Sequence, residues 1–127
     1  MNKIGFIGGG NMAEAIIRGL ISSGVTPGDI LVSDPSGERR QAMGQLRAAV
    51  AENNAEPALC AVVVLAIKPQ VMKEVLEDIR SDINEDALFI SIAAGIPTRF
   101  IEEQLGKVRV VRVMPNTPML AGKGVAA

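Results

Sequence analysis

The 127-residue sequence contains no histidine, tryptophan or tyrosine, one cysteine and three phenylalanines. Without histidine, His-based triads are excluded, and Cys60 alone forms neither an internal disulfide nor a metal site, so we expect no metal. Aromatic side chains that stack on bases are almost absent, and no five like charges are adjacent. Nucleic-acid binding is therefore not expected.

Long apolar runs are also missing. The longest, residues 58–67, has ten residues and ends at Lys68 and Pro69, whereas a membrane helix needs roughly 20. The N-terminus carries one lysine and a short apolar stretch before three glycines, which is unlike a signal peptide. These features predict one cytoplasmic domain with no membrane partner.

Short apolar strands alternate with amphipathic helices along the chain. We expect strands at residues 3–7, 30–33, 49–51, 61–67, 87–91 and 109–114. We expect helices at residues 11–23, 38–48, 69–79 and 98–105, the second of them capped by Ser36. This alternation predicts an α/β, Rossmann-type doubly wound, mostly parallel sheet with helices on both faces, formed by residues 1–127.

The core is expected to contain most of the methionines and the cysteine. In the helix at 69–79, the spacing of Val71, Val75, Leu76 and Ile79 predicts an inward stripe. The methionines and Cys60 are read as buried filler, not as a site. The methionines concerned are Met12, Met43, Met72, Met114 and Met119.

Residues 8–13 read Gly-Gly-Gly-Asn-Met-Ala, which fits the pattern G-x-G-x-x-G/A between a strand and a helix. In that pattern Gly8 permits the tight turn, Gly10 lets a pyrophosphate approach the backbone, and Ala13 keeps the helix close to the strand. The helix N-terminus adds unpaired N–H groups and positive potential. The motif predicts dinucleotide binding, and the alternative is a purely structural glycine turn.

The cofactor type depends on the end of the second strand. Asp34 lies 24 positions after Gly10, where a carboxylate binds the ribose 2′-OH of NAD. Four neighbouring side chains, however, can accommodate a 2′-phosphate. They are Ser33, Ser36, Arg39 and Arg40. The sequence therefore leaves NADP or NAD open, with plain turn chemistry and a solvated helix face as the alternative.

Two further segments fall at carboxyl ends of predicted parallel strands, the edge at which open α/β sheets bind ligands. They are residues 66–69, with Lys68 as a candidate for cofactor ribose or phosphate, and residues 93–95, small enough for a nicotinamide to lie against the backbone. After the last strand, Arg112, Asn116 and Thr117 are candidates for contact with a carboxamide or a substrate. Ordinary loop, packing and turn roles are the alternatives.

Four segments, GFIGGGNMAEAIIRGL, LAIKPQ, ISIAAGIP and RVMPNTP, occur in this order and resemble the N-terminal half of bacterial pyrroline-5-carboxylate reductases. The resemblance implies three groups of cofactor-binding residues. Those for the pyrophosphate are Ile7, Gly8, Gly9, Gly10, Asn11 and Met12, and those for the adenosine ribose are Ser33, Asp34, Pro35 and Asn54. Those for the nicotinamide side are Ala66, Ile67, Lys68, Pro69, Ala93, Ala94 and Gly95.

The resemblance also implies a reaction, hydride transfer from NAD(P)H to the cyclic imine of 1-pyrroline-5-carboxylate to give L-proline, the last step of proline biosynthesis. Reduction of a protonated imine gives the neutral amine directly, so the protein mainly orients the reactants, which suits a chain without His or Tyr. Catalytic side chains are not identified. Two alternatives are a deazaflavin-linked NADP reductase, which should lack the MPNTP stretch, and a non-enzymatic NAD(P)-sensing module.

Members of the resembled family continue into an all-helical domain that dimerises and supplies the substrate pocket. We expect this chain to lack that domain, to bind cofactor without turning over substrate, and to expose an apolar patch near residues 119–127. The full-length protein is expected to be a homo-oligomer assembled through the absent domain.

Overall fold

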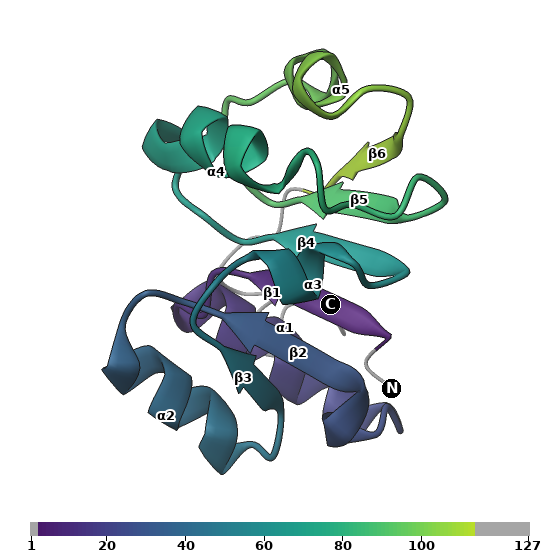
Figure 1. Ribbon diagram of the computed structural model, residues 1–127. Helices are drawn as coiled ribbons and strands as arrows, with labels where there is room; N and C mark the ends of the chain where they lie inside the picture. Colours follow the sequence, from purple (N-terminus) through teal and green to yellow (C-terminus); the bar gives the residue numbers. More distant parts are fainter. Residues whose placement is uncertain (1–2, 114–127) are drawn as a thin grey trace, which may run out of the picture.

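The computed structural model describes residues 3–113, which form a six-stranded parallel sheet of order β3-β2-β1-β4-β5-β6 (Figure 1). The strands are β1 (Ile4–Ile7), β2 (Ile30–Ser33), β3 (Ala49–Ala51), β4 (Val62–Leu65), β5 (Leu88–Ser91) and β6 (Arg109–Arg112). The helices are α1 (Asn11–Ser22), α2 (Gly37–Gln45), α3 (Ala55–Ala58), α4 (Met72–Ile79) and α5 (Thr98–Leu105), with 3-10 turns η1 (Pro27–Asp29) and η2 (Pro69–Val71). The predicted doubly wound, Rossmann-type sheet is confirmed.

The central strand β1 separates two halves that wind in opposite directions. Ile4 pairs with Ile30 of β2 on one side and with Val62 of β4 on the other. The order of strands therefore reverses between β1 and β4. Open α/β sheets have their ligand crevice at such a point, beyond the carboxyl ends of the strands.

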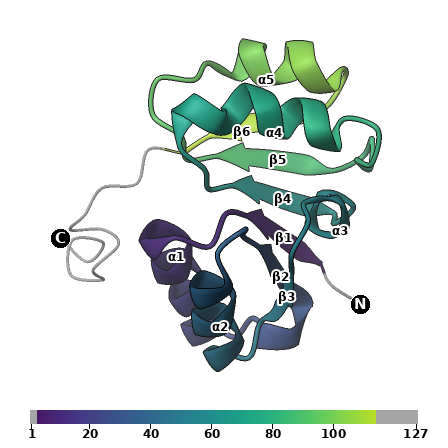
Figure 2. The same cartoon turned by 60° about the vertical axis from the view of Figure 1, so that its left-hand side comes forward.

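Alternate residues of the strands enter two separate cores, because successive side chains of a strand point to opposite faces. In β1, Phe6 packs in a cluster with residues of α1 and α2, whereas Ile7 packs in a second cluster with residues of α4 and α5. Figure 2 shows α1 and α2 beside β1–β3, and α4 and α5 beside β4–β6. Both faces of the sheet are thus covered, as predicted.

A short helix, α3, was not expected from the sequence. Its backbone lies so close to β1 that a Cβ at Gly5 would overlap the carbonyl oxygen of Pro57 and lie 2.8 Å from the carbonyl carbon. Gly5 is therefore needed for close approach of α3 to β1, not for a turn. Four residues are too few to show a helical period, so the sequence carried no signal for this element.

Several predicted boundaries shift. The helix expected to reach residue 48 ends at Gln45, because the chain turns at Arg47, whose φ is +71°, and enters β3. The strand expected at 61–67 is confined to Val62–Leu65, and the helix expected from residue 69 begins as the 3-10 turn η2. The last strand is described over Arg109–Arg112, and Met114 lies outside the described residues.

Two predicted core residues are exposed. Met12 on α1 is 39% exposed and Val71 in η2 is 38% exposed, so the prediction for both was wrong. Met43, Met72 and Cys60 are buried as predicted, and burial raises the pKa of the Cys60 thiol. The apolar patch expected near residues 119–127, like Met119, lies outside the described residues. Within residues 3–113, no helix combines the length and apolarity that crossing a membrane requires.

We expect Gly5→Ala to lower the free energy of unfolding by about 1–3 kcal/mol, because the added methyl group forces β1 and the Pro57 backbone apart. Gly19→Ala is the matched control, since no atom lies within 4 Å of a Cβ at this exposed position of α1. It should raise the free energy of unfolding by about 0.5–1 kcal/mol. Urea denaturation measures both, and an unchanged midpoint for Gly5→Ala would contradict the close approach.

Candidate cofactor-binding site

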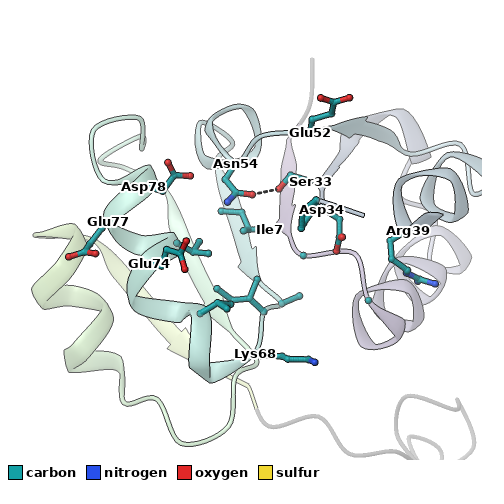
Figure 3. Close-up of a pocket in the computed structure, with 17 residues that line it drawn as sticks. Ile7, Ser33, Asp34, Arg39, Glu52, Asn54, Lys68, Glu74, Glu77 and Asp78 are labelled. Carbon is teal, nitrogen blue, oxygen red and sulfur yellow. Dashed lines mark hydrogen bonds between the residues drawn. The ribbon is translucent and has the colours of Figure 1, made fainter. Parts of the chain in front are cut away.

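A pocket of 1120 Å³ opens at the carboxyl ends of β1, β2 and β4 (Figure 3). It occupies the point at which the strand order reverses. Figure 3 shows Ser33, Asp34 and Asn54 on one side of the pocket and Glu74 and Asp78 of α4 on the other. The lining residues are Ile7, Gly8, Gly10, Ser33, Asp34, Pro35, Arg39, Glu52, Asn54, Ala66, Ile67, Lys68, Val71, Glu74, Val75, Glu77 and Asp78.

The glycine turn between β1 and α1 borders the pocket. Gly8 has φ +105°, and a Cβ there would overlap the carbonyl oxygen of Ala66 in the neighbouring strand end. Gly10 is the N-cap of α1, and no atom lies within 4 Å of a Cβ built on it. The turn is therefore closed toward β4 at Gly8 and open toward the pocket at Gly10, so a phosphate has room to reach the backbone there.

Asp34 links the end of β2 to the glycine turn. Its Oδ2 accepts a hydrogen bond of 2.8 Å from the backbone N–H of Gly9, and its Oδ1 accepts one of 2.8 Å from the N–H of Ser36. The carboxylate thus makes hydrogen bonds that order the turn, as the structural alternative for Asp34 expects, and it also lines the pocket. Each oxygen has a second lone pair with which it can accept a ligand hydroxyl.

The two arginines of α2 bind backbone carbonyls of the two loops. Arg39 donates from Nε to the carbonyl of Gly9 at 2.6 Å, and its Nη2 pairs with Glu14 at 2.8 Å. Arg40 donates to the carbonyl of Asp34 at 2.8 Å and lies 3.7 Å from Glu52. The guanidinium of Arg39, with a further bond from Arg18, lowers the pKa of Glu14.

Asn54 is oriented by a buried hydroxyl. The Oγ of Ser33, which is fully buried, donates to Oδ1 of Asn54 at 2.7 Å. Since Oδ1 receives this proton, the amide presents its NH₂ group as a donor elsewhere. Asn54 immediately precedes α3. The close packing of α3 against Gly5 therefore also places Asn54 at the pocket.

The wall formed by η2 and α4 was not predicted. Val71 and Val75 contribute apolar surface to it, and Glu74, Glu77 and Asp78 contribute carboxylates. Helical periodicity assigns these carboxylates to the solvated face of α4, but it does not show that this face overlooks the crevice. Glu52, which follows β3, was missed for the same reason, because its position depends on tertiary packing.

The structure brings together eleven of the candidate binding residues named from the sequence: Ile7, Gly8, Gly10, Ser33, Asp34, Pro35, Arg39, Asn54, Ala66, Ile67 and Lys68. Ten others do not line this pocket: Gly9, Asn11, Met12, Ser36, Arg40, Pro69, Ala93, Ala94, Gly95 and Arg112. Ala93–Gly95 follow β5, which is one strand further from the reversal point than β4. Asn116 and Thr117 lie outside the described residues.

Titratable side chains in residues 3–113 do not gather into a metal site. No group of three or more His, Cys, Asp or Glu side chains in this part of the chain is placed to hold a metal ion. The polar groups of the pocket are instead Ser33, Asn54, two cations and carboxylates. The carboxylates can accept from ligand hydroxyls, and the cations and N–H groups can donate to a phosphate.

A family model described as NADP oxidoreductase coenzyme F420-dependent matches residues 3–95. The chain belongs to this family. The matched residues include the glycine turn and the strand ends around the pocket but stop before residues 114–118, the MPNTP stretch. The family match alone therefore does not separate the two kinds of reductase that were considered from the sequence.

Curated relatives over nearly the whole chain are named pyrroline-5-carboxylate reductase. The protein of Haemophilus influenzae is 49% identical over 97% of this chain and 46% of its own length, and that of Escherichia coli is 44% identical over 98% and 48%. The chain thus spans about half the length of the curated relatives it matches.

Solved structures agree with this similarity. A pyrroline-5-carboxylate reductase from Coxiella burnetii superposes with a TM-score of 0.88 at 41% identity, over 99% of this chain and 47% of that protein. The pyrroline carboxylate reductase of Plasmodium falciparum, solved with NADP bound, superposes with a TM-score of 0.80 at 31% identity, over 95% of this chain and 45% of that protein.

We expect Gly10→Val to remove dinucleotide binding while leaving the fold intact. A Cβ at this position has no atom within 4 Å beyond the neighbouring residues, and loss of a glycine N-cap should cost about 1 kcal/mol. Affinity should fall more than about tenfold, because the branched side chain keeps a phosphate away from N–H groups whose hydrogen bonds to charge are worth about 1.5–3 kcal/mol each. Calorimetry with NADPH tests this, and Gly19→Val in the same helix is the control. Equal affinities of Gly10→Val and wild type would refute the placement.

Proposed function

We propose that this chain is the dinucleotide-binding part of a pyrroline-5-carboxylate reductase. The reaction would be hydride transfer from NAD(P)H to 1-pyrroline-5-carboxylate, giving L-proline. The observation that carries the proposal is the glycine turn, open at Gly10 toward a pocket at the reversal point of a parallel sheet. The names of relatives that match 97–98% of the chain support the choice of reaction over the deazaflavin-linked alternative.

The residues of the pocket fit such a cofactor. In our proposal the pyrophosphate lies against the turn at residues 7–12, where the N-terminus of α1 offers N–H groups and positive potential. The ribose of the adenosine lies near residues 33–35 and Asn54, whose NH₂ is turned away from Ser33 by their hydrogen bond. Residues 66–69 and 93–95 then face the nicotinamide side, and Asn116 and Thr117 the substrate side.

The chemistry asks little of the side chains. Bound NAD(P)H supplies the hydride, and the protein's own residues orient the cofactor and shield one side of it. No general acid is required of this chain, because a protonated imine becomes a neutral amine once it accepts hydride. Substrate contacts would come mainly from the second half of a longer protein. Relatives about twice as long support the existence of such a second half, and the resemblance implies that it is a helical domain that also makes the homo-oligomer.

Both NADP and NAD remain candidates for the cofactor. The relative from Plasmodium falciparum has NADP bound, whereas the carboxylate of Asp34 lines the pocket of this chain at the position that binds the ribose 2′-OH of NAD. We place the enzyme in the cytoplasm, where proline synthesis would use it.

Titration calorimetry with NADPH and NADH, in parallel with an assay of NADPH oxidation by 1-pyrroline-5-carboxylate, tests the function. We expect this chain to bind dinucleotide with no turnover, and the full-length relative from Haemophilus influenzae to do both. Binding of neither dinucleotide would overturn the proposal. A further variant joins this chain to the second half of a relative. If this chain binds dinucleotide but the joined protein does not oxidise NADPH with 1-pyrroline-5-carboxylate, the NAD(P)-sensing alternative is favoured.

Asp34→Asn should shift preference toward NADPH. An anion a few ångströms from a 2′-phosphate repels it by on the order of 1–4 kcal/mol near a protein surface, so the ratio of NADPH to NADH affinity should rise severalfold. Affinity for both should also fall somewhat, because an amide replaces one of the oxygens that accept backbone N–H groups. Asp29→Asn is the control, since Asp29 pairs with Lys3 away from the pocket. An unchanged ratio would show that Asp34 does not face the 2′ position.

A further inference from the structure

The β2–α2 corner, that is Asp34 after β2 together with Arg39 of α2, holds the backbone of Gly9 at both of its polar groups. The N–H of Gly9 donates to Asp34 at 2.8 Å, and its carbonyl accepts from Nε of Arg39 at 2.6 Å. Gly9 lies in the middle of the glycine turn, between the tight turn at Gly8 and the N-cap of α1 at Gly10. The orientation of the turn is therefore set by two side chains 25 and 30 residues away.

Arg39 is already engaged at two nitrogens. Besides the bond to Gly9, its Nη2 donates to Glu14 at 2.8 Å, and only 26% of the side chain is exposed. Glu14 lies in the first turn of α1, so Arg39 joins α2 to the glycine turn and to the helix that begins there. The paired guanidinium also lowers the pKa of Glu14, because its hydrogen bond stabilises the charged carboxylate.

These contacts point to a role for Arg39 other than the one suggested by the sequence, in which it receives a 2′-phosphate. Of the five N–H groups of its guanidinium, the bonds to Gly9 and Glu14 use one on Nε and one on Nη2. Both of these bonds reach the glycine turn or the helix that follows it. Such contacts suit a role that does not depend on which dinucleotide binds.

We propose that Arg39 is a positioning residue for the glycine turn. By holding the Gly9 carbonyl against α2 while Asp34 holds the N–H, it keeps Gly10 and the N-terminus of α1 open toward the pocket. The role rests on the proposed function, since the ligand is the pyrophosphate that NADH and NADPH share. Loss of Arg39 should accordingly weaken both dinucleotides by the same factor.

The test compares Arg39→Met with Arg18→Met. Arg18 also pairs with Glu14, at 3.0 Å, but it has no bond to Gly9, and its side chain is 61% exposed. Arg18→Met therefore controls for the loss of a positive charge beside Glu14. Calorimetry should show NADH and NADPH affinities both about tenfold lower in Arg39→Met, the size of one charge-assisted hydrogen bond, with their ratio unchanged. Arg18→Met should bind like wild type. Loss of NADPH affinity alone would overturn the proposal and make Arg39 a phosphate ligand.

A second measurement needs no ligand. In ¹H–¹⁵N spectra of the free protein, Arg39→Met should move the amide signals of Gly9 and Gly10, while signals from β5 and α5 and the melting temperature stay close to wild type. Glycine signals that do not move would overturn the positioning role, and a general loss of dispersion would show instead that Arg39 supports the whole fold. If the wild type binds neither dinucleotide, the proposed function fails, and these spectra still decide the role of Arg39.

Discussion

The pocket depends on the hydrogen bonds that tie the N–H and the carbonyl of Gly9 to the β2–α2 corner. A glycine-rich turn has many accessible conformations, and its backbone is useful to a ligand only when one of them is fixed. Asp34 and Arg39 fix it through the N–H and the carbonyl of Gly9, which belong to the two successive peptide groups on either side of its Cα, and Glu14 anchors Arg39 in turn. The turn is thereby ordered before any ligand arrives, so binding need not meet the cost of ordering it.

The segments around this turn are placed by close contacts between backbones at two glycines. Without a Cβ at Gly8, the turn lies against the end of β4, and without one at Gly5, α3 lies against β1. The second approach matters for the pocket because α3 begins directly after Asn54, whose amide is oriented by Ser33. Two glycines with different local conformations thus place two parts of the pocket lining relative to the same strand.

The sequence predicted what local patterns determine. Strand and helix periods fixed the sheet, and the spacing of glycines followed by Asp34 located the turn and the corner that meet at the reversal point. It did not reveal α3, which is shorter than a helical period can show, nor that the solvated face of α4 with Glu74 overlooks the pocket. It also treated Arg39 as a cation free to bind a ligand. The bond of Arg39 to Gly9 spans 30 residues, and the local spacing of residues does not predict such a contact.

The charges around the pocket indicate how it can hold an anionic ligand. The lining includes Asp34, three carboxylates of α4 and Glu52, but only two cations, Arg39 and Lys68. Arg39 already pairs with Glu14, so Lys68 is the only lining cation without an ion pair among the residues that the structure describes. Side-chain charge therefore contributes little net attraction here. Affinity for a dinucleotide must come chiefly from backbone N–H groups at the glycine turn and the N-terminus of α1, whose geometry the Gly9 contacts control.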